Sequence, residues 1–206
     1  MRTKLMAAAL TGSMAVSACA STAAGQERPR VVFETDAGRM VLELALDRAP
    51  LTVCNFLSYV TDGDYEAGSF FRTVVSETND NPHPIDVIQA ATPRGADDTL
   101  RPPVPLERTR DTGLSHVAGA VSMARDGPDT ATSSFFIVTR DAPALDFGGG
   151  RNPDGQGFAV FGRLVEGLDV ARRLQTMPAD DQEQLTPPVL IRTASLIGEV
   201  PPECRP

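Results

Sequence analysis

Hydrophobic and polar residues alternate along much of the chain, as they do in half-buried β-strands. Residues 31–35 and 39–45 alternate on either side of Asp36-Ala37-Gly38, which predicts a hairpin. Further strands are expected where aromatic and β-branched residues gather between turn residues. These strands cover residues 70–75, 85–89, 133–139, 158–164 and 189–197, with one more ending before Arg125. A proline-bearing turn is expected just before the last strand, and His116 is expected to open the strand that ends before Arg125.

Two segments follow the helical period instead. Apolar residues recur at i, i+3, i+4 and i+7 in the first: Val53, Phe56, Leu57 and Val60. Asp47 is expected to cap this helix, Pro50 suits its first turn, and Gly63 is a good terminator. The second, shorter helix is expected over residues 168–174.

About eight strands and two helices define an all-β class. The connections are short and antiparallel, apart from polar loops over residues 76–84, 92–111 and 141–157. Closing the sheet into a barrel would give every strand two neighbours, which removes exposed sheet edges. The sequence therefore predicts a closed eight-stranded antiparallel barrel capped by two α-helices.

Residues 1–18 have the composition of a secretory signal. Arg2 and Lys4 precede a mainly apolar stretch without acidic residues, which is too short for a transmembrane helix. Residues 16–19 resemble a bacterial lipobox, in which Cys19 would be lipidated and become the new N-terminus. The alternative is simple secretion, with cleavage after Ala20. The protein is thus expected in the periplasm, either anchored to a bacterial membrane by lipid, or soluble there or secreted.

The remainder of the chain fits one domain. Residues 19–29 are expected to form a flexible polar tether, residues 30–198 the barrel, and residues 199–206 a C-terminal tail. The net charge of the 206-residue chain is −8, and removing Arg2 and Lys4 makes it −10. An acidic surface without a basic cluster argues against a nucleic-acid partner and against membrane binding by charge. A monomer whose function lies in a pocket is expected.

The cysteines leave two alternatives open. If Cys19 is lipidated or removed, Cys54 and Cys204 remain as an even pair in an oxidising compartment and are able to form a disulfide. Otherwise one is a buried thiol on the first helix and the other a free thiol on the tail. Wide spacings, with His83 and His116 far from any cysteine in sequence, indicate no metal site. No G-x-S-x-G motif surrounds a serine, so His116 is expected to be structural.

One stretch carries a recognisable signature. The pattern S-M-A-x-x-G-P-x-T-x-x-S-x-F-F-I is matched by Ser122, Met123, Ala124, Gly127, Pro128, Thr130, Ser133, Phe135, Phe136 and Ile137. Four shorter matches stand in the same family's order: Pro50-x-Thr52-x-x-Asn55-Phe56, Phe70-Phe71-Arg72, Leu145-Asp146 and Phe161-Gly162-x-x-x-x-Gly167. Over residues 31–197 the chain therefore resembles the cyclophilins, which are prolyl cis/trans isomerases.

The resemblance implies a barrel closed at each end by a helix, with the site on an outer face. It implies rotation of X-Pro bonds in exported polypeptides without a metal or other cofactor. Arg72 would be the catalytic donor and Gln89 would orient it. The proline ring and its peptide would be bound by Val87, Ala124, the backbone at Arg125, Ser134, Phe136, Leu145 and Phe158.

Several positions depart from the family pattern. Asp86 stands at the place of a pocket phenylalanine, Ser134 replaces a common glutamine, and Phe71 replaces a histidine. Ala144 replaces the tryptophan of many eukaryotic members, which predicts weak cyclosporin binding. Either the long loop over residues 76–84 brings in another apolar side chain, or the pocket is shallower than usual. The alternative function is therefore a weakly active or inactive module that binds proline-containing segments.

Overall fold

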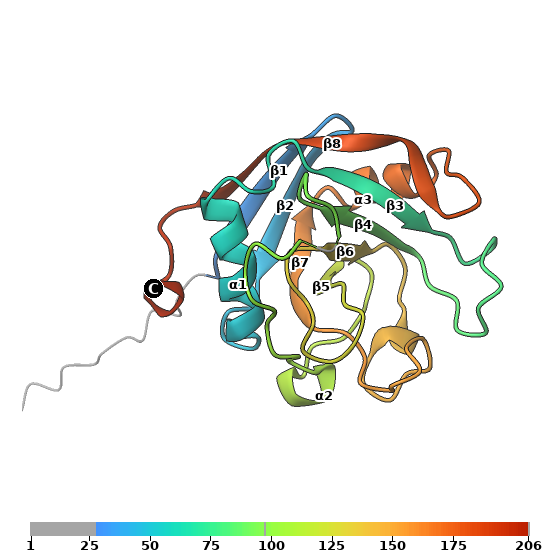
Figure 1. Cartoon of the computed structure of the whole chain (residues 1–206), viewed down its shortest axis with the longest axis horizontal. Helices are drawn as coiled ribbons and strands as arrows, with labels where there is room; N and C mark the ends of the chain where they lie inside the picture. The colour runs from blue at the N-terminus through green and yellow to red at the C-terminus, as the bar shows by residue number, and fades with distance from the viewer. Residues whose placement is uncertain (1–27, 97, 206) are drawn as a thin grey trace, which may run out of the picture.

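The chain folds into a closed antiparallel β-barrel (Figure 1). The structure is a computed structural model that describes residues 28–96 and 98–205. The expected signal segment, Cys19 and most of the expected tether lie outside the described residues. Strands neighbour one another in the order β1-β2-β7-β5-β6-β4-β3-β8, and the last pairs with the first. This order confirms the predicted closed eight-stranded barrel.

The strands lie close to their predicted positions, with one clear exception. Their bounds are β1 Arg30–Thr35, β2 Gly38–Leu44, β3 Ser69–Val74, β4 Val87–Ala91, β5 Ala120–Met123, β6 Phe135–Val138, β7 Val160–Glu166 and β8 Gln184–Ile197. The predicted turn before residue 189 is wrong, because Pro187 and Pro188 lie inside β8. Proline is tolerated there because these residues fall within a register shift, where they have no partner on β3.

Both predicted helices are present and lie on opposite sides of the barrel in Figure 1. They are α1, Pro50–Thr61, and α3, Leu168–Gln175. A third helix, α2, spans only Thr109–Thr112, and short 3-10 turns occur at Pro143–Leu145 (η1) and Pro202–Cys204 (η2). A single helical turn is too short to show an apolar period, which is why the sequence did not indicate α2.

The free backbone N–H groups at the start of α1 are hydrogen-bonded by a side chain that is distant in sequence. The N-cap residue is Ala49, so the expected cap at Asp47 is wrong. Instead the backbone N–H groups of Leu51 and Thr52 donate to the two carboxylate oxygens of Glu107, at 3.2 and 2.7 Å. An acidic group at this end also complements the helix dipole. Glu107 thereby fixes the helix to the loop before α2.

A β-bulge at Phe71 decides which side chains of β3 face outward. Phe70 pairs with Ala90 on β4 and Arg72 pairs with the adjacent Gln89, so Phe71 is an extra residue. Simple alternation would place Phe70 and Arg72 on one face, but the bulge puts them on opposite faces. Phe70 is fully buried in the core, whereas Arg72 lines a groove on the outer face.

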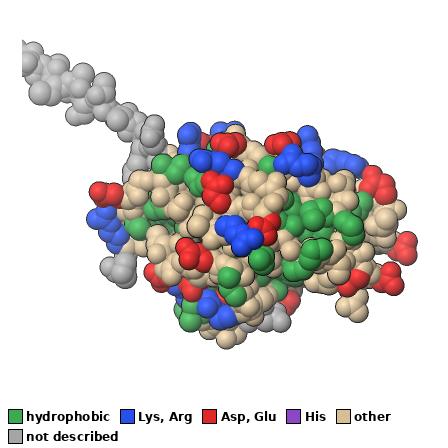
Figure 2. Space-filling model, turned by 90° about the horizontal axis from the view of Figure 1, so that it is seen from above, with side chains coloured by type: hydrophobic (Ala, Val, Ile, Leu, Met, Phe, Trp, Pro, Cys, Tyr) green, Lys and Arg blue, Asp and Glu red, His purple; other side chains and the backbone are tan. Residues whose placement is uncertain are grey.

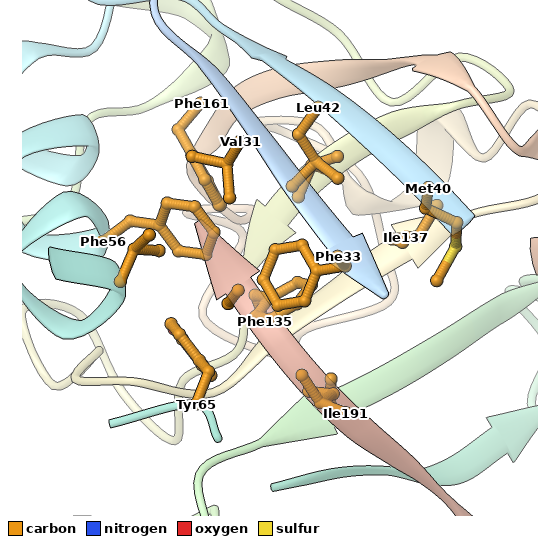
Figure 3. Packing of buried hydrophobic residues seen from close by; sticks show 14 of the residues in the cluster. Val31, Phe33, Met40, Leu42, Phe56, Tyr65, Phe135, Ile137, Phe161 and Ile191 are labelled. Carbon is orange, nitrogen blue, oxygen red and sulfur yellow. The ribbon is translucent and has the colours of Figure 1, made fainter. Parts of the chain in front are cut away.

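Aromatic rings fill the barrel interior (Figure 3). Phe56 of α1 packs against Phe161 at a centroid distance of 4.9 Å and against Phe135 at 5.4 Å. Phe33 and Tyr65 complete the cluster, and the Tyr65 hydroxyl donates to the Ser133 carbonyl at 2.5 Å. Ring pairs of this kind add about 0.5–1.5 kcal/mol each to simple burial. The packed interior holds β6 in place, and the next residue along β6 faces the groove.

A disulfide joins Cys54 on α1 to Cys204 on η2, across 150 residues of sequence. This is the pairing that the sequence left as one of two alternatives. In Figure 1 the C-terminal segment lies beside α1. The next residue on α1, Asn55, donates to the carbonyl of Thr132, which lines the outer groove. The disulfide therefore fastens the tail to a helix that also supports a groove loop.

Opposite charges are interspersed on the surface (Figure 2). Arg163 pairs with Glu43 at 2.9 Å and Arg192 pairs with Asp36 at 2.5 Å. Exposed pairs of this kind contribute about 0–1 kcal/mol each. Within the described part of the chain, no helix is long and apolar enough to cross a membrane.

Candidate active site

A groove of about 460 Å³ crosses β3, β4 and β6 on the outer face of the barrel. Loops before and after β4, after β5 and before β7 complete its walls. Every residue predicted to catalyse or bind substrate lines this groove: Arg72, Val87, Gln89, Ala124, Arg125, Ser134, Phe136, Leu145 and Phe158. Residues from five separate segments are thus brought to one place by the barrel.

Gln89 holds Arg72 from one side. The two residues are register partners on β3 and β4, and the Arg72 Nη1 atom donates to Gln89 Oε1 at 3.1 Å. The Gln89 Nε2 atom donates to Ser134 Oγ at 3.0 Å, and that hydroxyl donates to the Ala90 carbonyl at 3.0 Å. Ser134 therefore orients Gln89, which in turn orients Arg72.

Glu183 holds Arg72 from the other side, and the sequence did not indicate this residue. Its Oε2 atom accepts from Arg72 Nε at 3.1 Å and from Nη2 at 2.5 Å. Its Oε1 atom accepts from the side-chain amide of Asn79 at 2.5 Å. Glu183 lies immediately before β8, which pairs with β3, and 111 residues separate it from Arg72. No local pattern connects residues that far apart in sequence.

The apolar end of the groove is formed around Phe136. Its ring packs edge-to-face against Phe158 at a centroid distance of 5.5 Å. Other members of the same buried cluster also line the groove: Val74, Ile85, Val87 and Leu145. Phe158 lies in the loop before β7, not inside the strand as expected. These side chains line an apolar hollow in which a pyrrolidine ring would bury apolar surface.

Ile85, and not Asp86, faces this hollow. The Asp86 carboxylate turns away, where it accepts from Ser76 N at 3.1 Å and from the Gln175 side-chain amide at 3.0 Å. The expectation that Asp86 occupies the place of a pocket phenylalanine is therefore wrong. Counting back from Gln89 by strand alternation puts residues 87 and 85 on the groove face. Ile85, directly after the long loop over residues 76–84, therefore supplies the apolar side chain that the hollow needs.

A buried histidine supports Phe136 from behind. The His116 ring stacks on Phe136 at a centroid distance of 5.9 Å and an interplanar angle of 12°. Its Nδ1 atom lies 2.7 Å from Asp146 Oδ1 and its Nε2 atom 3.0 Å from Ser122 Oγ. Burial lowers the pKa of His116, and the Asp146 carboxylate partly opposes that shift. Ser122 is fully buried and so is inaccessible as a nucleophile, despite this Ser-His-Asp arrangement.

Arg125 joins two groove loops through its side chain. The guanidinium forms a bidentate pair with Asp154 at 2.7 and 2.9 Å and also donates to the Gly157 carbonyl. It lies 5.0 Å from the centre of the Phe158 ring. The hydrogen bond from Arg125 lowers the pKa of Asp154. Arg125 was expected to act through its backbone, and its buried side chain additionally fixes Phe158.

The groove places the hydrogen-bond donors of a guanidinium, Arg72, beside the apolar surface around Phe136. Among residues 28–96 and 98–205, no group of three or more His, Cys, Asp or Glu side chains is arranged to hold a metal ion. A guanidinium keeps its charge at all ordinary pH values and presents N–H donors in a fixed fork. The arrangement of Arg72 beside the Phe136 hollow on a closed barrel defines the cyclophilin class of proteins.

Comparisons with known proteins give the same class. The family model described as cyclophilin type peptidyl-prolyl cis-trans isomerase/CLD matches residues 30–196. Peptidyl-prolyl cis-trans isomerase cyp18 of Streptomyces antibioticus is 35% identical, over 82% of this chain and 98% of that protein. Peptidyl-prolyl cis-trans isomerase A of Dickeya dadantii is 32% identical, over 94% of this chain and 98% of that protein. The chain belongs to the cyclophilin-type peptidyl-prolyl cis-trans isomerase family.

Solved structures show the same fold. A crystal structure of a Cryptosporidium parvum cyclophilin type peptidyl-prolyl cis-trans isomerase superposes with a TM-score of 0.65 at 21% identity. The match covers 84% of this chain and 99% of that chain. A second crystal structure of the same protein, determined in the presence of the dipeptide Ala-Pro, gives a TM-score of 0.66.

Proposed function

We propose that this protein catalyses cis/trans rotation of X-Pro bonds in exported polypeptides, with Arg72 as the catalytic residue. One observation carries the proposal. The Arg72 guanidinium is fixed by Gln89 and Glu183 in the same groove as the apolar hollow around Phe136. A proline ring held in that hollow would bring its peptide bond close to a charged donor.

The catalyst must weaken the amide resonance of the X-Pro peptide bond. This resonance gives the peptide bond a rotation barrier of about 18–20 kcal/mol, and uncatalysed X-Pro exchange takes tens to hundreds of seconds. A donor that binds the lone pair of the prolyl nitrogen withdraws that pair from resonance. The N–H groups of Arg72 that its protein partners leave free are suited to this role. No covalent bond breaks, so the reaction uses no nucleophile.

Arg72 alone accounts for only part of a useful acceleration. A million-fold rate increase corresponds to about 8 kcal/mol. One preorganised donor in a water-excluded site typically contributes about 3–4 kcal/mol. The remainder would come from the hollow around Phe136, which fixes the ring and excludes water while the carbonyl rotates.

The decisive experiment measures exchange of an X-Pro peptide by NMR with the wild type and with Arg72→Ala. We expect the variant to lose about 10²–10³-fold in kcat/KM, because it lacks the donor. Arg72→Lys should fall between the two, since it keeps a charge but not the fork. Equal and negligible rates in all three proteins, with peptide affinity retained, would support the alternative of a proline-binding module.

The cellular location is part of the same proposal. The composition of residues 1–18 and the sequence before Cys19 support export with lipid attachment. The Cys54–Cys204 disulfide supports an oxidising compartment such as the periplasm. Mass spectrometry of the mature N-terminus tests it, with Cys19→Ser as the control. A lipidated Cys19 is expected in the wild type, and an unmodified start at Ser21 would contradict anchoring.

A further inference from the structure

Arg151 differs from the other guanidinium groups of the groove. Arg72 is paired with Glu183 and Arg125 with Asp154, each within a hydrogen-bond distance. Arg151 also lines the groove, yet no carboxylate of the described residues lies within 4.0 Å of it. Among the described residues its side chain donates only to neutral acceptors, which are the side-chain oxygen of Asn79 at 3.3 Å and the backbone carbonyl of His83 at 3.2 Å.

One edge of this guanidinium has free donors. Both contacts are made by Nη1, so Nε and Nη2 donate to no acceptor among residues 28–96 and 98–205. These two atoms form the side of the fork that binds a carboxylate in a bidentate manner. Burial lowers the pKa of Arg151, with nearby Glu183 opposing and nearby Arg72 reinforcing the shift. A carboxylate brought into the groove here would compensate a partly desolvated positive charge.

The position of Arg151 is fixed by the long loop over residues 76–84. Asn79 of this loop accepts from Arg151 and donates to Glu183, which holds Arg72. The loop also packs closely on Gly150, where an added Cβ would overlap the His83 ring. A continuous set of hydrogen bonds therefore connects Arg151 to Arg72 through Asn79 and Glu183. Both guanidinium groups line the same groove, so a peptide bound along it would pass both.

We propose that Arg151 forms an anion subsite that selects proline-containing segments with an aspartate or glutamate near the proline. The inference rests on the proposed isomerase function and adds a preference in substrate charge. Asp126, on the loop after β5, is exposed and lines the same groove without an arginine partner among the described residues. It would repel an acidic residue on its own side. The preference is therefore expected at one flanking position only.

The test uses peptides that differ at a single position. A glutamate, its neutral isostere glutamine, or a lysine is placed directly before the proline or two residues after it. NMR exchange gives kcat/KM, and NMR titration of the same peptides gives Kd. At low salt the wild type should prefer glutamate over glutamine about five-fold at one of the two positions, in line with a partly exposed ion pair. Lysine should be the poorest substrate, and added salt should reduce the preference.

Three variants test whether Arg151 causes the preference for glutamate. Arg151→Gln should lower the glutamate-to-glutamine ratio to about one, and Arg151→Lys should retain most of the ratio. Arg192→Gln removes the same charge from an exposed arginine that pairs with Asp36 on the β1–β2 turn. That control should leave the ratio unchanged.

Two results would overturn the subsite. One is a wild type that shows no charge preference in kcat/KM or in Kd at either position. The other is an Arg151→Gln protein that slows all peptides equally, since that outcome makes Arg151 a structural link between loops. Failure of the isomerase function gives a different result. In that case no peptide is turned over, while the charge preference in Kd still reports on Arg151.

Discussion

Glu183 holds the edge of the Arg72 guanidinium formed by Nε and Nη2, at 3.1 and 2.5 Å, while Nη1 is bonded to Gln89. An arginine side chain has five N–H donors, and these three bonds use three of them. One hydrogen each on Nη1 and Nη2 therefore stays available for a peptide. Arg72, the proposed catalytic group, is thus oriented by Gln89 on β4 and by Glu183 just before β8. Such preorganisation reduces the entropy lost when a substrate reacts.

Removing the Glu183 carboxylate should misorient Arg72. We expect Glu183→Ala to lower kcat by about ten-fold, or about 1.4 kcal/mol, with KM changed much less. Glu183→Gln keeps an acceptor oxygen and should lose less. NMR exchange measures both values, and Glu199→Gln, in the exposed tail, is the matched control. A Glu183→Ala protein as fast as the wild type would mean that Gln89 alone positions Arg72.

Asp86 should matter for stability and not for catalysis. Asp86→Ala removes the acceptor of the Ser76 N–H and of one N–H of the buried Gln175 amide, whose nitrogen also donates to the Val74 carbonyl. The loss should cost about 1–3 kcal/mol. Chemical denaturation measures this loss, and the exchange rate of the folded protein should stay near the wild-type value. Asp86→Phe should also destabilise the fold, because its ring would replace a hydrogen-bonded carboxylate. A faster and equally stable Asp86→Phe protein would contradict this assignment.

Local patterns and family motifs predicted many of the residues that line the groove. The spacing around Phe136 and Gln89 was sufficient because those residues lie on regular strands. Simple periodicity does not describe two parts of the groove. The bulge at Phe71 puts Phe70 and Arg72 on opposite faces. The motif spacing predicts Asp86 in the hollow, whereas strand alternation from Gln89 favours Ile85, which is the residue found there. Sequence periodicity also carries no information on contacts between distant loops, such as those of Glu183.

The Cys54–Cys204 disulfide should stabilise the fold without altering the groove chemistry. The chain-entropy relation gives about 5 kcal/mol for a loop of this length, as an upper bound. Cys54→Ser, Cys204→Ser and the double variant should therefore show similar losses in urea denaturation. Their exchange rates should match the wild type wherever they are folded, because neither cysteine lines the groove. Equal unfolding midpoints with and without the bond would contradict the prediction.

His116 should make the stability of the protein depend on pH. It is 1% exposed, and burial favours the neutral ring, so its pKa in the folded chain lies below the ordinary 6.5. Below about pH 6.5 the unfolded chain then binds more protons than the folded chain, and stability falls as the pH falls. The slope from this one group is at most about 1.4 kcal/mol per pH unit, and it ends below the folded-state pKa.

Urea denaturation between pH 7.5 and 5.5 measures this dependence with little contribution from carboxylates, whose ordinary pKa values lie near 4. His116→Gln should be less stable at pH 7.5, because it loses the contacts to Asp146 and Ser122, but its stability should change less with pH. NMR titration of the His116 ring should give a midpoint below 6.5. A midpoint above 6.5 would mean that the Asp146 carboxylate outweighs burial, and stability would then rise as the pH falls through that range.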